Sequence, residues 1–276
     1  TSRHEAPLDG IIVEKAQRIA TVTLDYPPVN VLTLARYAEI TRVFDEISTM
    51  DDVNVVVFTA KGTKAFCAGL DLQEFLAATP EEDPHRASIV RATFKAIRHC
   101  KVPVIAAVNG PALGAGCVLA GASDIRIASE KPTFAMPEIN VGRCRGGRDT
   151  GRLVPQGTLR LMAFTGEPIS AWEAHRVGMV EQVVTPRRLM PTAMDLAGII
   201  AKKSPIGLRL MKEALNRIET MPVDEGYELE QQYSTRLMMT EDAREATRSV
   251  VEKRAPVFTG RCARRSGISL PGRSYS

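Results

Sequence analysis

The chain has 276 residues and a net charge of +4, from 36 basic and 32 acidic side chains. Hydrophobic residues make up 44% of it, which is enough apolar material for a large folded core and excludes a disordered chain. The nearly balanced charge does not point to a nucleic-acid-binding protein. Because no run of about 18 uncharged apolar residues occurs, we expect no membrane-spanning helix.

The five cysteines are irregularly spaced and form no CxxC pair, which argues against a disulfide framework or a zinc site. We therefore expect free thiols, a reducing compartment and no bound metal. The first ten residues, TSRHEAPLDG, lack the apolar segment of a secretory signal. The expected location is the cytoplasm, or an organellar matrix if a transit peptide has been removed.

The first 130 residues alternate between predicted strands and predicted helices, which favours an α/β fold with parallel strand pairing. Two of the strands are continuous apolar runs, as in a sheet that is buried on both faces. The predicted strands are residues 10–13, 19–24, 55–59, 102–108 and 124–128, and the predicted helices are residues 34–50 and 86–99.

After about residue 155 the pattern becomes helical, with a single strand candidate at 180–184. We expect an α/β core over residues 1–200, a helical region for oligomerisation and active-site covering over 201–260, and a basic tail over 261–276. The apolar helical faces must pack on the core or on a neighbouring subunit. The tail is expected to be solvated, with contact to an anionic partner as the alternative. The predicted helices are residues 157–164, 170–177, 188–203, 205–218 and 223–253.

Two glycine-containing turns, at residues 64–72 and 109–117, each follow a buried strand and lead into a predicted helix. Glycine lets backbone approach a ligand closely, and helix N-termini present free N–H groups. Two such turns facing each other would aim two donors at one oxygen, as in an oxyanion hole. Taken singly, a turn of this kind is more often a plain connection between a strand and a helix.

Several blocks in the right order resemble the crotonase superfamily, the enoyl-CoA hydratase/isomerase family. The most specific is FCAGLDL, and the others include a proline–asparagine segment and a Pro-Glu pair. The resemblance covers about 250 residues and stops near residue 261. The matching blocks are residues 27–32, 65–72, 102–117, 134–142, 165–180 and 251–254.

The resemblance implies an α/β spiral of repeated ββα turns, assembled into trimers or hexamers, that acts on an acyl-CoA thioester. It assigns the backbone N–H groups of Leu70 and Ala115 to the oxyanion hole and the acid/base role to Glu138. The family usually has glycine where this chain has Ala115. Alanine disfavours a positive φ, so the geometry of this donor depends on the local backbone.

A second departure concerns the reaction. Hydratases of the family carry another glutamate where this chain has Val118. Adding water usually uses two carboxylates, whereas moving a double bond needs one base. We therefore expect isomerisation of an enoyl-CoA through Glu138, with hydration as the alternative if Asp149 or a bound water supplies the second role.

The loop after Glu138 also departs from the family's glycine-rich stretch, because it carries Arg143, Arg145 and Arg148. Arginines near an acyl pocket suggest recognition of a charged or polar acyl group. A solvated loop, or a salt bridge to a neighbouring subunit, is the alternative.

For the CoA moiety, the resemblance implies that Phe66, Ala68, Asp71 and Leu72 line the adenine side, largely through backbone, and that Lys253 reaches phosphate. CoA is part of the substrate, so no separate cofactor is expected. Neither a membrane nor nucleic acid is an expected partner. A non-catalytic acyl-CoA-binding or RNA-binding homologue is the rival hypothesis, motivated by Val118 and the basic tail.

Overall fold

A six-stranded sheet is the centre of the first of two units in the computed structural model, which describes residues 10–260. The units are Thr1–Lys202 and Lys203–Ser276. The strand order is β1-β2-β3-β4-β6-β9, antiparallel between β1 and β2 and parallel between all other neighbours. These strands are β1 (Ile11–Ala16), β2 (Ile19–Leu24), β3 (Val55–Ala60), β4 (Val104–Val108), β6 (Ile125–Ser129) and β9 (Gln182–Val184).

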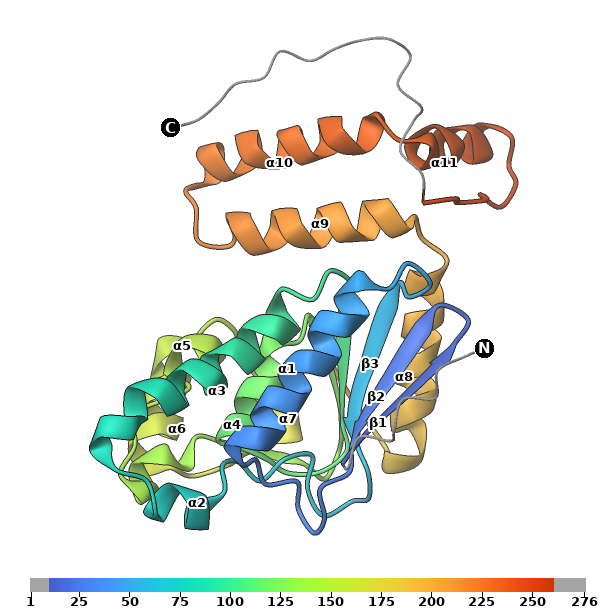
Figure 1. Ribbon diagram of the computed structural model, residues 1–276. Coiled ribbons are helices and arrows are strands. Elements are labelled where there is room, and N and C mark those ends of the chain that lie inside the picture. Colours follow the sequence, from blue (N-terminus) through green and yellow to red (C-terminus); the bar gives the residue numbers. More distant parts are fainter. Residues whose placement is uncertain (1–9, 261–276) are drawn as a thin grey trace. The chain divides into compact units, whose positions relative to one another are not determined.

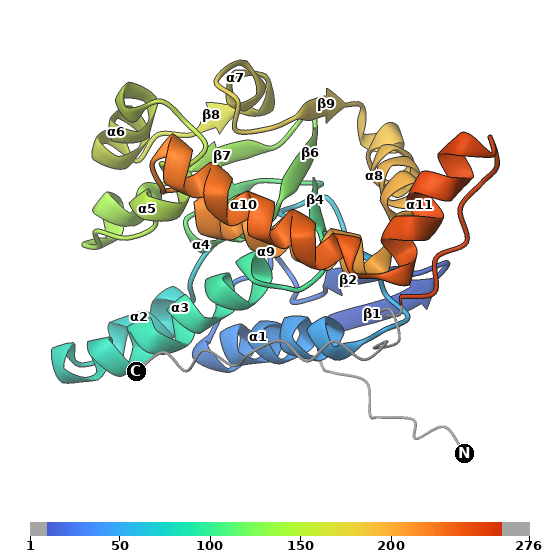
Figure 2. The same cartoon turned by 90° about the horizontal axis from the view of Figure 1, so that it is seen from above.

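Helices cover both faces of this sheet. On β3, Val56 and Phe58 join the core beneath α1 (Leu34–Thr49) and α3 (Asp83–Arg98), while Val55 and Val57 join the core beneath α8 (Pro186–Ala201). Figure 1 and Figure 2 show α1 and α3 together on one side of the sheet and α8 on the other. Because both faces are buried, β3 is apolar at almost every position, as the sequence indicated.

A second, three-stranded sheet has the order β5-β7-β8. Its strands are too short to carry a periodic pattern and were not predicted from the sequence. They are β5 (Ala112–Leu113), β7 (Thr133–Ala135) and β8 (Ile169–Ser170). The helix expected after the turn at 64–72 is present as α2 (Leu72–Leu76). Three further short helices were not predicted, for the same reason as the strands: η1 (Pro80–Glu82), η2 (Pro137–Val141) and α5 (Gly147–Thr150). The remaining helices of this unit are α4 (Ala115–Ala122), α6 (Gln156–Thr165) and α7 (Ala171–Arg176).

The described part of the second unit is helical. Helices α9 (Pro205–Ile218) and α10 (Val223–Met238) pack side by side (Figure 1), and α11 (Glu241–Val251) follows. The single helix predicted over 223–253 is therefore wrong. The helical conformation is interrupted between α10 and α11. Thr240 is the N-cap of α11, because its hydroxyl accepts a hydrogen bond from the Ala243 N–H (3.2 Å). The predicted tail 261–276 lies outside the described residues. No helix within residues 10–260 is long and apolar enough to cross a membrane.

One backbone crossing in the first unit leaves no room for a side chain. Gly116, near the start of α4, lies against Cys67, and a Cβ atom built on Gly116 would be 2.2 Å from the Cys67 carbonyl oxygen. That oxygen belongs to the backbone and cannot rotate away. Glycine at 116 is therefore what allows α4 to approach segment 66–69.

We expect Gly116→Ala to destabilise the protein by about 2 kcal/mol or more, because the added methyl group must push two backbone segments apart. The midpoint of thermal unfolding by circular dichroism measures the effect. Gly157→Ala in α6 is the matched control, since nothing lies within 4 Å of its built Cβ. It should leave the midpoint unchanged or raise it. An unchanged midpoint for Gly116→Ala would contradict the crossing described here.

Candidate active site

Two backbone segments run side by side and end at the same place. Cys67 and Ala112 form a parallel bridge, and the Leu113 N–H donates to the Cys67 carbonyl (2.9 Å). Because the segments are parallel, the residues that follow them, Leu70 and Ala115, emerge at the same end. A Cβ built on Gly69 would lie 3.9 Å from the Ala115 nitrogen, so the two turns are in contact there.

The N–H of Leu70 points away from the strand that flanks it. Leu32 donates to the Gly69 carbonyl (2.8 Å) and accepts from the Asp71 N–H (2.9 Å). In such a parallel bridge the residue between the two bonds directs its own N–H to the opposite side. Within residues 10–260 the Leu70 N–H has no acceptor.

The N–H of Ala115 is also free of intrachain bonding in the described region. Ala115 is the first residue of α4, where a helix leaves its N–H groups without an acceptor. The positive φ angles belong to the preceding glycines, 95° at Gly69 and 52° at Gly114, and Ala115 itself has none. The alanine at 115 therefore introduces no backbone strain, and its donor is preserved.

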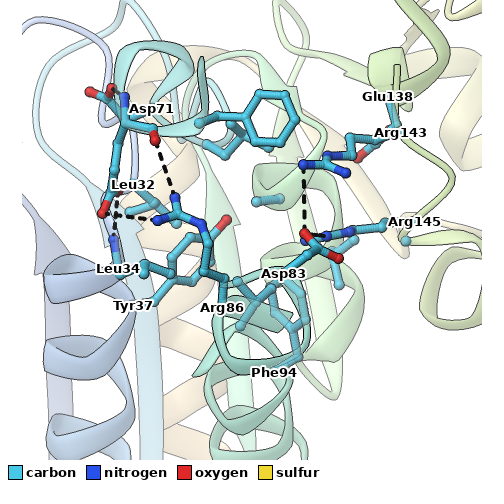
Figure 3. Close-up of a pocket in the computed structure, with 17 residues that line it drawn as sticks. Leu32, Leu34, Tyr37, Asp71, Asp83, Arg86, Phe94, Glu138, Arg143 and Arg145 are labelled. Atoms are coloured by element: carbon cyan, nitrogen blue, oxygen red, sulfur yellow. Dashed lines mark hydrogen bonds and ion pairs between the residues drawn. The ribbon is translucent and has the colours of Figure 1, made fainter. Parts of the chain in front are cut away.

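Leu70 and Ala115 line a pocket of about 70 Å³ whose wall is mainly apolar (Figure 3). Tyr37 on α1 and Phe94 on α3 close it, with their rings edge to face at 6.3 Å. Burial raises the pKa of the Tyr37 phenol, and the nearby Cys67 and Glu138 raise it further. Tyr37 therefore stays neutral and can donate a hydrogen bond.

Four carboxylates share this wall, and three of them have partners. Asp71 caps α2 by accepting from the Glu74 N–H (2.9 Å). Glu74 accepts from the Leu34 N–H (2.9 Å) and lies 3.9 Å from the Arg86 guanidinium. Asp83 pairs with two arginines of the loop after η2. These three carboxylates are engaged in holding the wall together.

The fourth carboxylate, Glu138, differs from the others. Its Oε2 atom is buried and has no hydrogen-bond partner among the described residues. Its Oε1 atom would lie 3.0 Å from a Cβ built on Gly114, the residue before Ala115. Burial raises the pKa of Glu138, and a hydrogen bond from its own backbone only partly opposes this. The site thus combines two free N–H donors with one desolvated, unpaired carboxyl group.

Val118 lies in the pocket wall and Asp149 does not. These are the two positions from which the sequence predicted isomerisation rather than hydration. Val118, on α4, is 2% exposed and lines the pocket, where its Cγ2 would lie 3.0 Å from a Cβ built on Gly146. Asp149, on α5, is not part of the pocket wall and forms an ion pair with Arg98 on α3. This placement does not favour Asp149 as a second acid.

The residues expected to bind CoA are not all available to a ligand. Phe66 is completely buried against Phe58, with ring centroids 5.4 Å apart, and its N–H is bonded to a carbonyl. Ala68 is partly exposed, and Leu72 is 54% exposed. Lys253 is exposed in the second unit. The Phe66 side chain cannot contact CoA, while contacts by the others remain a prediction.

The profile of the enoyl-CoA hydratase/isomerase family matches residues 14–261 of this chain. The chain belongs to this family. It is 36% identical to the short-chain-enoyl-CoA hydratase of Clostridium acetobutylicum over 90% of this chain and 96% of that protein. It is 35% identical to the (7aS)-7a-methyl-1,5-dioxo-2,3,5,6,7,7a-hexahydro-1H-indene-carboxyl-CoA hydrolase of Rhodococcus jostii, over 79% and 85% of the two chains.

Solved structures agree with this membership. The crystal structure of an enoyl-CoA hydratase from Bacillus anthracis superposes with a TM-score of 0.87 and 33% identity, covering 91% of this chain and all of that one. The crotonase fold and an acyl-CoA enzyme of the hydratase/isomerase family, both expected from the sequence, are therefore confirmed.

We expect Glu138→Gln to raise the midpoint of thermal unfolding at pH 8, because it removes a buried and unpaired charge. A raised pKa means that ionising Glu138 costs the folded state stability above its usual pKa of 4.5. The gain should therefore be present at pH 8 and shrink as the pH falls toward 4.5. Glu14→Gln, on the exposed face of β1, is the control and should show no such trend. A lower midpoint for Glu138→Gln at pH 8 would contradict this.

Proposed function

We propose that this enzyme moves a double bond in an enoyl-CoA, with Glu138 as the single proton carrier. Glu138 removes a proton from C2 of a 3-enoyl-CoA, and the electron pair spreads over the dienolate to the thioester oxygen. The same carboxylic acid then returns the proton to C4, which leaves the double bond between C2 and C3. No atom is gained or lost, and no second acid is required.

The N–H groups of Leu70 and Ala115 would hold the thioester oxygen during this step. Removing the C2 proton places negative charge on that oxygen, and fixed donors stabilise it, each by about 3 kcal/mol. Both donors belong to the backbone and carry no other hydrogen bond within residues 10–260, which supports the assignment.

The observation that carries the proposal is the state of the pocket carboxylates. Among the four that line the described pocket, only Glu138 has a buried oxygen without a partner. Its raised pKa suits a group that must both accept and return a proton. Val118 places hydrocarbon where a second carboxylate would be needed to orient water.

Hydration of an enoyl-CoA is the second candidate, because the Clostridium relative is named a hydratase. In that reaction Glu138 would take a proton from water as the oxygen attacks C3, and would then protonate C2. Because Asp149 is not part of the pocket wall, a bound water would have to take the second role in this route. The name of the Rhodococcus relative, a hydrolase, indicates that names within the family do not select one reaction.

We further propose that the chain forms trimers or hexamers, needs no cofactor beyond the CoA of its substrate, and works in the cytoplasm or an organellar matrix. Self-association is supported by apolar side chains exposed on α9 to α11, among them Met211, Tyr227, Met238 and Val250. RNA binding by the basic tail stays a rival hypothesis, and the tail lies outside the described residues.

We expect wild-type enzyme to convert a 3-enoyl-CoA to the 2-enoyl-CoA, and Glu138→Gln to lower kcat by a factor of about 10² to 10⁴, since the proton carrier is lost. The absorbance of the conjugated product measures turnover. Asp149→Asn is the control and should stay active. Release of 3-hydroxyacyl-CoA as the main product would reject isomerisation, and undiminished turnover by Glu138→Gln would reject the role of Glu138.

Val118→Glu should raise the ratio of hydration to isomerisation by about tenfold or more, because it adds the second acid/base group beside Glu138. Val118→Gln is the control, because the glutamine side chain has nearly the same volume as that of glutamate but carries no charge. Product ratios from a 3-enoyl-CoA and a 2-enoyl-CoA can be measured by liquid chromatography. Equal ratios in the two variants would show that the identity of residue 118 does not decide the reaction.

A further inference from the structure

Two arginines of the loop after η2 point at one carboxylate in the pocket wall. Asp83, at the start of α3, is bonded to Arg145 and lies 3.5 Å from the Arg143 guanidinium. Figure 3 shows the interactions of both arginines meeting at Asp83. Both guanidinium groups share this one carboxylate, so neither arginine has a carboxylate of its own among the ion pairs of the described residues.

Arg143 also has an unused hydrogen-bond donor. Its guanidinium carbon lies 3.9 Å from the centre of the Phe75 ring, which holds the side chain in place. Its Nε atom is buried and has no acceptor in the part of the chain that is described. A buried donor without an acceptor is costly, so the site is incomplete until a ligand provides one.

The other charged groups of the wall make contacts of their own. Arg86 points away from Asp83 (Figure 3) and is bonded to the Glu74 carbonyl oxygen (3.5 Å), near the carboxylate of the same residue. Asp71 is engaged as the cap of α2. Within residues 10–260 Glu138 forms no ion pair with Arg143 or Arg145.

We propose that the acyl group accepted by this pocket carries a second carboxylate, which binds to Arg143 and Arg145. The planar, two-oxygen shape of a carboxylate matches the fork of a guanidinium and would supply the missing acceptor. This inference rests on the proposed function and names its substrate class. Arg143, Arg145 and Glu138 line the same pocket, so the second carboxylate would bind in the pocket that holds the reacting carbons.

Of the three loop arginines considered from the sequence, only two belong to this arrangement. Arg148 is exposed on α5 and is not part of the pocket wall. The alternative of a solvated loop applies to Arg148. Arg143 and Arg145 are half-buried and form ion pairs with Asp83. Arg148 provides the matched control for the experiment.

The test compares the affinities of saturated, unreactive acyl-CoAs of equal carbon number by isothermal titration calorimetry. Glutaryl-CoA is paired with pentanoyl-CoA, and adipyl-CoA with hexanoyl-CoA. Wild-type protein should bind the carboxylated member of at least one pair about tenfold more tightly. Arg145→Met and Arg143→Met should bring that ratio close to one, and Arg148→Met should preserve it. Equal affinities in wild type, or a ratio that survives both pocket variants, would overturn the inference.

Turnover of 3-hexenoyl-CoA and crotonyl-CoA, measured on the same preparations, separates this inference from the proposed function. Turnover without any preference for the carboxylated ligand would refute the inferred second carboxylate and still support the proposed isomerisation. A preference for the carboxylated ligand without turnover of any enoyl-CoA, carboxylated or not, would remove the proposed reaction and leave the anion selectivity of Arg143 and Arg145 established.

Discussion

The contact between two backbone segments, residues 66–70 and 111–115, is the constraint on which the rest of the site depends. It is possible only because Gly116 has no side chain to meet the Cys67 carbonyl. The same contact brings the Leu70 and Ala115 N–H groups to one end of the pair, with Gly69 and Gly114 making the turns before them. Everything else in the pocket is arranged around donors whose positions are set by main chain alone.

The four carboxylates of the pocket wall differ in whether they have bonding partners. Asp71, Glu74 and Asp83 are bonded to a helix cap, a backbone N–H or arginine side chains. Glu138 is left with a buried oxygen that nothing in the described chain satisfies. An unpaired buried acid lowers stability, so its presence beside two free donors is more readily explained by function than by folding.

Much of this arrangement could be predicted from the sequence. The continuous apolar run of β3 indicated a sheet that is covered on both faces, and the FCAGLDL block indicated the turn that carries Leu70. The wall residues Tyr37 and Asp83 were missed, because an aromatic residue at helical spacing and an acid at a helix start look like ordinary core and capping residues. Which residues of separate helices meet across a pocket depends on packing, and no local pattern reports it. The break at Thr240 was missed because the apolar pattern continues through it.

The two donors belong to the main chain, whereas the pocket wall is made of side chains. Amino-acid substitutions therefore affect the donors and the wall differently. No replacement at position 70 or 115, short of proline, removes an N–H group, so mutation there alters shape without deleting the donor. Tyr37, Val118, Arg143 and Arg145, in contrast, line the pocket with their side chains and come from α1, α4 and a loop, so replacing any of them changes the pocket wall directly. Such a scaffold keeps two main-chain donors in place whatever side chains line the pocket around them.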